Sequence, residues 1–246
     1  MTARILIISG SDSGGGAGLQ ADIKTVTMLG GHAMTAVTAV TAQNTLGVSA
    51  VHLIPSTVVL AQIEAVLSDI GVDAIKIGMI GSAAAAHALA DRLEGLAVPI
   101  VFDPVMVATS GAPLADSETI NVFHRLMRLA ALTTPNLPEL EALGGEAAMI
   151  GPVLIKGGHG DGDLIVDRLI GAEGEVARWE GTRINTSSTH GTGCTLASAI
   201  ACGLGQAMTL TDSIERARRF VRAALENAPG LGLGHGPMGH QAVRDV

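Results

Sequence analysis

Apolar runs that alternate with helical patterns constrain this chain more than any other feature. The run RILIISG at 4–10 shows no polar alternation, as expected for a strand buried on both faces of a sheet. The next segment, 17–31, carries apolar residues at helical spacing and ends in a Gly-Gly pair. Strands that alternate with helices in this way predict a mostly parallel sheet covered by helices on both faces.

The alternation continues to the C-terminus. Further strands are predicted at 33–45, 48–54, 73–81, 98–106, the start of 132–145, 152–160, 163–171 and 174–181. Further helices are predicted at 56–71, 82–95, 116–131, the end of 132–145, 192–205 and 210–227, with Ser56 and Ser82 as N-caps of the first two. No repeat, low-complexity segment or linker interrupts this order. Residues 1–246 are therefore predicted to form one domain.

Composition and charge exclude several classes of protein. Hydrophobic residues make up 48% of the chain and charged residues 15%, which argues against disorder. The net charge of −8, without any basic run, argues against nucleic acid and anionic membranes as partners. No apolar run reaches the roughly 18 residues of a membrane helix, and the N-terminus resembles a first strand and not a signal peptide.

The two cysteines, Cys194 and Cys202, predict a reduced protein. If 192–205 is one helix, they lie about 12 Å apart along its axis at roughly 1.5 Å per residue. A disulfide needs Cα atoms closer than about 7 Å, so the two cannot pair within the chain. A cytoplasmic location is therefore expected.

Polar or glycine-rich segments follow the predicted strands. Ligands in open α/β sheets bind outside the carboxyl ends of the strands, so these residues are expected to share one edge and form an enzyme site. The residues at or just past strand ends are Gly10, Gln43, Met79, Asp103, Asn136 and Lys156.

The motif HGTGC at 190–194 stands where a glycine-rich loop becomes an apolar helix. The first N–H groups of a helix have no partner inside it and suit phosphate oxygens, so Gly191, Thr192 and Gly193 predict an anion hole for phosphoryl transfer. The helix terminus is also expected to lower the pKa of the Cys194 thiol, which suits a base. The alternative is that Cys194 is a small buried residue that only packs beneath the helix.

Three further motifs each leave two interpretations. In TPNLPE (134–139), Asn136 and Glu139 either hold Mg²⁺ through water near polyphosphate or form a helix cap. Lys156, one of three lysines, either reaches a phosphate or lies in a surface turn. The amide of Gln43 either matches a heterocycle with an amino group beside a ring nitrogen or satisfies backbone groups in a turn.

The glycine-rich segment SGSDSGGGAG (9–18) follows the first strand and allows close backbone approach, or is only a turn. It matches neither the P-loop nor the dinucleotide fingerprint. A nucleotide-dependent oxidoreductase is therefore disfavoured.

The chain resembles the bacterial hydroxymethylpyrimidine/phosphomethylpyrimidine kinases of thiamin biosynthesis, which belong to the ribokinase-like superfamily. The shared segments follow one another over nearly the whole chain: GSDSGGGAGLQADIKT, TAQNTLGV, KIGM, DPVM, TPNLPE, KGGH, THGTGCTLASAIA and GHGP. The resemblance implies a three-layer α/β/α fold with a mostly parallel central sheet, usually in a homodimer. It also implies ATP- and Mg²⁺-dependent phosphorylation of 4-amino-5-hydroxymethyl-2-methylpyrimidine and then of its monophosphate to the diphosphate.

The resemblance implies roles for the motif residues. Gln43 resembles the amide that reads the aminopyrimidine edge. The pocket walls correspond to Gly10, Asp12, Ala17, Met79 and Val105. Cys194 takes the place of an aspartate that is the base in many ribokinase-like enzymes, and the anion hole corresponds to Gly191, Thr192 and Gly193.

On the nucleotide side, Asn136 and Glu139 resemble the motif that orders Mg²⁺ and phosphate. Asp103 is expected to assist through water. Lys156 and the loop after it resemble nucleotide-binding elements.

Two features depart from the family pattern. Only 16 residues separate Glu139 from Lys156, where the family usually has a longer segment with an additional helix. Thr109 stands where relatives often carry a lysine in a mobile flap, so the monophosphate step is expected to be slower than in lysine-bearing relatives.

Two alternatives to the pyrimidine kinase remain at this point. A pyridoxal or pyridoxine kinase of the same superfamily is the nearest, although Gln43 and the cysteine-bearing anion hole favour the pyrimidine. A non-enzymatic vitamin-sensing module has no need of the intact HGTGC motif.

Overall fold

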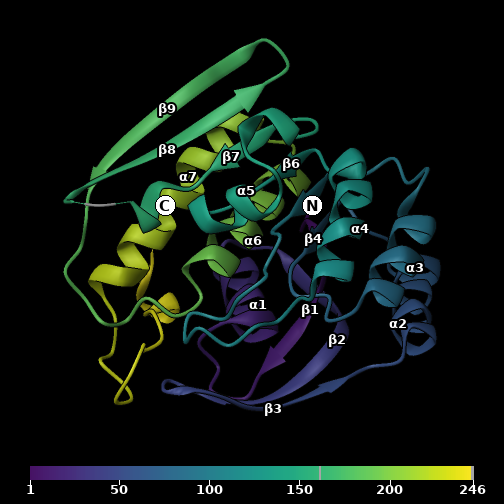
Figure 1. The fold of residues 1–246 in the computed structure, drawn as a ribbon, viewed down its shortest axis with the longest axis horizontal. Helices are drawn as coiled ribbons and strands as arrows, with labels where there is room; N and C mark the ends of the chain where they lie inside the picture. The colour runs from purple at the N-terminus through teal and green to yellow at the C-terminus, as the bar shows by residue number, and fades with distance from the viewer. Residues whose placement is uncertain (161, 245–246) are drawn as a thin grey trace.

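The computed structural model describes residues 1–160 and 162–244 and contains one nine-stranded sheet (Figure 1). The strand order is β3-β2-β1-β4-β5-β6-β7-β8-β9. The strands are β1 (Arg4–Asp12), β2 (His32–Asn44), β3 (Gly47–Leu53), β4 (Ala74–Ile77), β5 (Ile100–Phe102), β6 (Leu132–Thr133), β7 (Val153–Ile155), β8 (Leu164–Gly171) and β9 (Gly174–Thr182). The helices are α1 (Gly18–Met28), α2 (Ser56–Asp69), α3 (Ala83–Leu93), α4 (Ser117–Leu129), α5 (Leu137–Ala142), α6 (Thr192–Gly205) and α7 (Leu210–Glu226).

The centre of the sheet is parallel and its two ends are antiparallel. Strands β2, β1, β4, β5, β6 and β7 pair in parallel, whereas β3 and the β8–β9 hairpin run antiparallel to their neighbours. In Figure 1 the hairpin forms a long arm at one end of the sheet, and β3 lies at the opposite end. Crossover connections in parallel sheets need helices, which explains the alternation seen in the sequence.

Each face of the central sheet has its own apolar core. Leu6 and Ile8 of β1 pack with α2, α3 and α4, while Ile5 and Ile7 pack with α1, α6 and α7. Successive side chains of a strand point to opposite faces, so a strand buried on both sides must be apolar throughout. The three-layer α/β/α prediction is therefore confirmed.

The predicted elements all form; β4, β5 and β7 are shorter than predicted, and one predicted cap is wrong. Ser82 caps α3 by accepting a hydrogen bond from the Ala85 N–H, as predicted. Ser56 is instead the first residue of α2, and Pro55 occupies the N-cap position without a side-chain hydrogen bond. Because Pro55 fixes its own φ near the cap geometry, the helix begins without a capping side chain.

The connection between α5 and β7 is short. It contains only a 3₁₀ turn, Glu146–Ala148, and no α-helix, in agreement with the short spacing seen in the sequence. Among the described residues, none of the helices combines the length and apolar character needed to cross a membrane.

Candidate active site

A cavity of about 1380 Å³ lies along the carboxyl ends of the parallel strands. Cys194 at the start of α6 and Gln43 near the end of β2 both line it. The full set of residues given roles from the sequence lines the same cavity: Gly10, Asp12, Ala17, Gln43, Met79, Asp103, Val105, Asn136, Glu139, Lys156, Gly191, Thr192, Gly193 and Cys194. The topology thus brings together residues that are up to 184 positions apart.

Helix α6 begins at the cavity without any capping side chain. Its N-cap, Gly191, has a left-handed φ of 82° and makes no side-chain cap. A Cβ on Gly191 would lie 2.1 Å from the carbonyl oxygen of Gly16, so the glycine-rich loop after β1 and the start of α6 touch through their backbones. The Thr192 N–H donates to the carbonyl oxygen of Thr189 at a long 3.4 Å, and no side chain caps the helix terminus, which suits an anion.

The thiol of Cys194 is not acidified, which corrects the sequence-based prediction. Burial raises the pKa of Cys194 to about 11, against the lowering effect of the Lys76 ammonium. Desolvation disfavours the thiolate more than the helix terminus was expected to favour it. In the unliganded protein the residue is a protonated thiol at neutral pH.

Alkylation of Cys194 is therefore expected to be slow and steeply pH-dependent. Below its pKa of about 11 the thiolate fraction rises tenfold per pH unit, to only about 0.1% at pH 8. In a Cys202→Ala background, the rate of iodoacetamide labelling should rise about tenfold per unit between pH 7 and 10. A labelling rate that levels off near pH 8 would contradict the raised pKa.

A cluster of opposite charges lies beside the start of α6. Lys156 Nζ lies 2.8 Å from Asp103 Oδ1 and 3.9 Å from Glu139 Oε2. Burial raises the pKa of Glu139 to about 7, while Lys156 opposes the shift. Burial alone lowers the pKa of Lys156, but the two carboxylates raise it above its ordinary value, so this lysine stays charged.

The capping interpretation of Asn136 and Glu139 is realised. The Asn136 side chain accepts from the Glu139 N–H at 2.9 Å, and the Glu139 carboxylate accepts from the Asn136 N–H at 2.8 Å. This capping box fixes Glu139 in place, so its carboxylate faces Lys156 across the cavity wall.

The acidic residues fit Mg²⁺ only in part. Among residues 1–160 and 162–244, no group of three or more His, Cys, Asp or Glu side chains forms a metal site. Mg²⁺ is commonly bound by one or two carboxylates together with substrate phosphates, and Asp103 and Glu139 match that smaller requirement. The protein alone does not form a closed cage for the ion.

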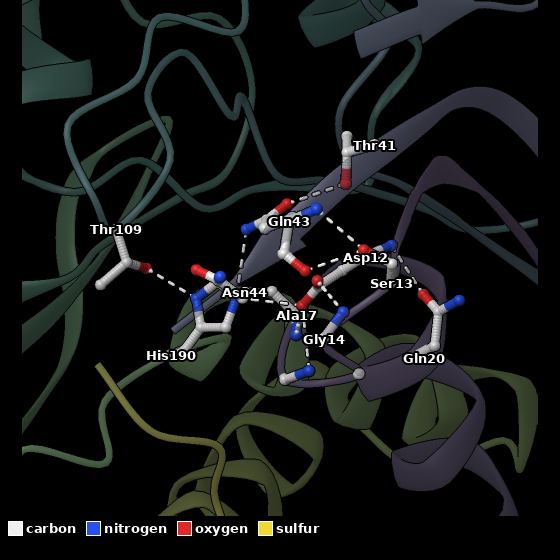
Figure 2. Close-up of polar contacts among 12 residues, drawn as sticks. Asp12, Ser13, Gly14, Ala17, Gln20, Thr41, Gln43, Asn44, Thr109 and His190 are labelled. Carbon is white, nitrogen blue, oxygen red and sulfur yellow. Dashed lines mark hydrogen bonds and ion pairs between the residues drawn. The ribbon is translucent and has the colours of Figure 1, made fainter. Parts of the chain in front are cut away.

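At one end of the cavity, polar side chains gather around His190, as Figure 2 shows. His190 Nε2 lies 3.0 Å from Asp12 Oδ2 and 3.2 Å from the amide of Gln43, while Nδ1 lies 3.3 Å from Thr109 Oγ1. Burial raises the pKa of Asp12, but hydrogen bonds from His190 and from the backbone of Ala17 outweigh this and lower it below its ordinary value. A short hairpin closed by the Val107–Pro113 bridge carries Thr109 over this region.

Gly10 and Met79 form a close wall of the same end. A Cβ on Gly10 would lie 2.8 Å from the sulfur of Met79, so a larger residue at position 10 displaces that side chain. Met79 is itself buried.

Neither His190 nor the arginines that line the cavity were predicted from the sequence. The role of His190 was not predicted because its partners are distant in the chain. Four arginines also line the cavity: Arg183, Arg218, Arg219 and Arg222. Arg183 donates to the carbonyl oxygens of Gly158, Gly160 and Gly162 and so shapes the loop after Lys156. The run ERARRFVR in an acidic chain was the available signal for the three on α7.

Solved structures similar to this one are small-molecule kinases. A pyridoxal kinase from Bacillus subtilis in complex with ADP superposes with a TM-score of 0.89 at 30% identity and covers 98% of each chain. A phosphomethylpyrimidine kinase from Clostridium difficile superposes with a TM-score of 0.77 at 34% identity, over 90% of this chain and 98% of the other.

Sequence relatives give the family. The family model described as phosphomethylpyrimidine kinase matches residues 12–150 and 146–239, two segments that meet in the short connection before β7. A hydroxymethylpyrimidine/phosphomethylpyrimidine kinase of Mycobacterium leprae is 44% identical, over 96% of this chain and 92% of that protein. A thiamine biosynthesis bifunctional protein of Geobacter sulfurreducens is 47% identical over 98% of this chain, which spans 53% of that longer protein. The chain belongs to the phosphomethylpyrimidine kinase family, and the resemblance seen in the sequence is confirmed.

Proposed function

We propose that this protein transfers a phosphoryl group from ATP to 4-amino-5-hydroxymethyl-2-methylpyrimidine, and a second one to the resulting monophosphate. The observation that carries the proposal is the uncapped start of α6, which adjoins Cys194 in one cavity with Gln43. An anion hole, a group that can accept a proton and an amide that can bind an aminopyrimidine edge suit this reaction. Relatives named for this activity are 40–44% identical over nearly the whole chain.

The substrate-side residues divide the work in this proposal. Gln43 binds the aminopyrimidine edge, and the N–H groups of Gly191, Thr192 and Gly193 stabilise charge on the transferring group. The thiolate form of Cys194 accepts the proton of the substrate hydroxyl group and becomes the thiol. Its raised pKa makes the thiolate a strong base but a scarce one in the free protein. Gly10, Asp12, Ala17, Met79 and Val105 shape the pocket.

The nucleotide-side residues are Asn136, Lys156, Asp103 and Glu139. Lys156, which stays charged between two carboxylates, contacts phosphate oxygens in this proposal. Asp103 and Glu139 would hold Mg²⁺ together with the nucleotide, and the ion would supply charge neutralisation at the phosphates. Asn136 contributes through the capping box that fixes Glu139.

One assay tests the activity. The protein is incubated with ATP, Mg²⁺ and the hydroxymethylpyrimidine, and the products are identified by mass. Monophosphate followed by diphosphate supports the proposal. No phosphorylated pyrimidine, from protein shown to be folded, overturns it and favours the sensing module.

Pyridoxal phosphorylation is the second candidate. Pyridoxal kinases from Bacillus subtilis and Staphylococcus aureus superpose with TM-scores of 0.87–0.89, above the 0.77 of the pyrimidine kinase structure. Parallel reactions with pyridoxal, compared by kcat/KM, decide between the two. A higher kcat/KM for pyridoxal would reverse the order of the candidates.

We also propose a homodimer in the cytoplasm. Strand β3 is an open edge, and the β2–β3 end of the sheet exposes Val40, Val51 and Leu53 by 44–47%. Apolar side chains on an open edge are commonly covered by a partner. Light scattering should give twice the chain mass, and Val51→Glu should lower the measured mass. A monomer at micromolar concentration contradicts the dimer.

The proposed cytoplasmic location rests on the cysteines. Two free cysteines suit a reducing compartment.

Thr109 is expected to limit the second phosphorylation. The hairpin at 107–113 carries no cation, so it offers the substrate's own phosphate no charged partner. Thr109→Lys should raise kcat/KM for the monophosphate by about tenfold, the value of one charge-assisted hydrogen bond. Thr109→Met, of similar length and without charge, is the control. Equal rates for the two variants would contradict the expectation.

A further inference from the structure

Asp12 acts only as an acceptor. Its carboxylate accepts from the backbone N–H groups of Gly14, Gly16 and Ala17 at 2.8–2.9 Å, which occupies both oxygens. A proton on this carboxyl group would compete with those donors. The nearby Nε2 of His190, 3.0 Å from Oδ2, must therefore carry a hydrogen and donate it to Asp12.

The imidazole ring of His190 is held in place. It is 5% exposed, and a Cβ on Gly16 would lie 2.5 Å from its Cδ2 atom. The ring packs against the glycine-rich loop whose N–H groups bind Asp12, so the loop, Asp12 and His190 form one connected unit.

The amide of Gln43 contacts this unit at one end and Thr41 at the other. Its nitrogen lies 3.2 Å from His190 Nε2 and its oxygen lies 3.0 Å from Thr41 Oγ1; both contacts are dashed in Figure 2. In that orientation two donors face each other at His190. The single hydroxyl hydrogen of Thr41 would also have to serve two acceptors, the Gln43 oxygen and the carbonyl oxygen of Ser11, which lies 2.9 Å away.

A half-turn of the amide removes both conflicts. The oxygen of Gln43 then shares the His190 Nε2–H with Asp12 Oδ2 in a bifurcated hydrogen bond, and the nitrogen donates to Thr41 Oγ1. The hydroxyl hydrogen of Thr41 is free to bind Ser11. The amide oxygen and nitrogen are nearly equal in size, so the hydrogen-bond network decides their positions.

We propose that Asp12 and His190 are a positioning pair that fixes the Gln43 amide, oxygen toward His190 and nitrogen toward Thr41, and thereby selects amino over oxo heterocycles. The selectivity rests on the proposed role of Gln43 in binding the substrate ring. Neither residue of the pair needs to touch the reacting atoms.

The selectivity follows from donor and acceptor order. Each amide atom keeps one position for a ligand: a second lone pair on oxygen and a second hydrogen on nitrogen. An amino group beside a ring nitrogen presents a donor and an acceptor, which match these positions in one order. A 4-oxo ring presents a carbonyl beside a ring N–H, the reverse order. If the Gln43 amide could rotate freely, it would bind the edge of either ring. When its orientation is fixed, the 4-oxo ring places donor against donor and acceptor against acceptor.

Nitrogen-15 NMR of the free protein at pH 7.5 tests directly whether His190 Nε2 carries the hydrogen that fixes the Gln43 amide. His190 is assigned by comparison with His190→Gln in protein labelled at histidine. A hydrogen on Nε2 is expected; a neutral ring with the hydrogen on Nδ1 overturns the proposal. This measurement needs no turnover, so it stands apart from failure of the proposed pyrimidine kinase activity.

Substrate discrimination tests the consequence. In His190→Leu, the ratio of kcat/KM for the 4-amino substrate over its 4-oxo analogue should fall by about tenfold or more, since one mismatched buried pair no longer opposes the analogue. In His190→Gln the amide nitrogen has two hydrogens, for Asp12 and for Gln43, so the ratio should recover. An unchanged ratio in folded His190→Leu overturns the proposal. If that variant does not fold, a lost ratio in His190→Gln with wild-type melting overturns it.

Discussion

Cys194→Ala is expected to lower kcat by about 10²–10⁴-fold, the usual contribution of a positioned general base. KM for both substrates should change little, because the N–H groups at the start of α6 and the walls of the cavity remain. Initial rates over a range of pyrimidine and ATP concentrations measure both constants. A kcat within about threefold of the parent would make the thiol a packing residue only.

Two variants sharpen the interpretation. Cys194→Asp places a carboxylate at the start of the helix, where a negative charge is favoured, and should recover part of the lost rate with a pH profile that is flat near neutrality. The wild-type rate should instead rise with pH, since the pKa of its thiol lies near 11. Cys202→Ala is the matched control, because Cys202 is buried in the α6 core away from the cavity.

Lys76→Met is expected to lower the free energy of unfolding by about 3–5 kcal/mol, the cost of leaving one partner of a buried ion pair uncompensated. Lys76 Nζ on β4 lies 2.8 Å from Asp22 Oδ2 on α1, and both side chains are 0% exposed. Ser198 on α6 donates to the other Asp22 oxygen at 2.7 Å. Burial alone lowers the pKa of Lys76, but Asp22 raises it above its ordinary value, so Lys76 stays charged. Burial raises the pKa of Asp22, and the Lys76 ammonium opposes that shift.

Urea denaturation of single and double variants measures this effect. The double variant Asp22→Leu/Lys76→Met should lose less free energy of unfolding than the sum of the two single variants. Removing both charges leaves no unpaired charge in the core. Arg125→Met, which breaks the exposed pair with Asp91, is the control and should cost only about 0–1 kcal/mol. Additive costs for the buried pair would show that the two charges do not stabilise each other.

Much of the fold was predictable because local patterns and global topology agree. Apolar runs such as 4–10 can be satisfied only between two helical layers, and the lengths of the connections require crossover helices. The failure at Ser56 has a local cause. A serine before an apolar run suggests a cap, but Pro55 already has the extended backbone that a cap position needs.

The site was predictable where one motif occupies one strand end. Gln43, Asp103, Lys156 and the glycines at 191 and 193 reach the cavity because parallel strands deliver their carboxyl ends to one edge. The protonation state of Cys194 was not predictable from the sequence, because the burial of its thiol depends on packing from several elements. The positions of His190 and Thr109, 81 residues apart, depend on the same tertiary packing, which no short motif encodes.

The close backbone contact between Gly16 and Gly191 also limits which residues of this site can be replaced. A methyl group at position 191 would overlap a carbonyl oxygen, and one at position 16 would overlap the imidazole ring. Side-chain changes that keep α6 and the first loop together are therefore easier in the hairpin at 107–113 than at positions 16 and 191. The start of α6 and the first loop form one rigid part of the site, and variation in specificity is expected to come from the segments around it.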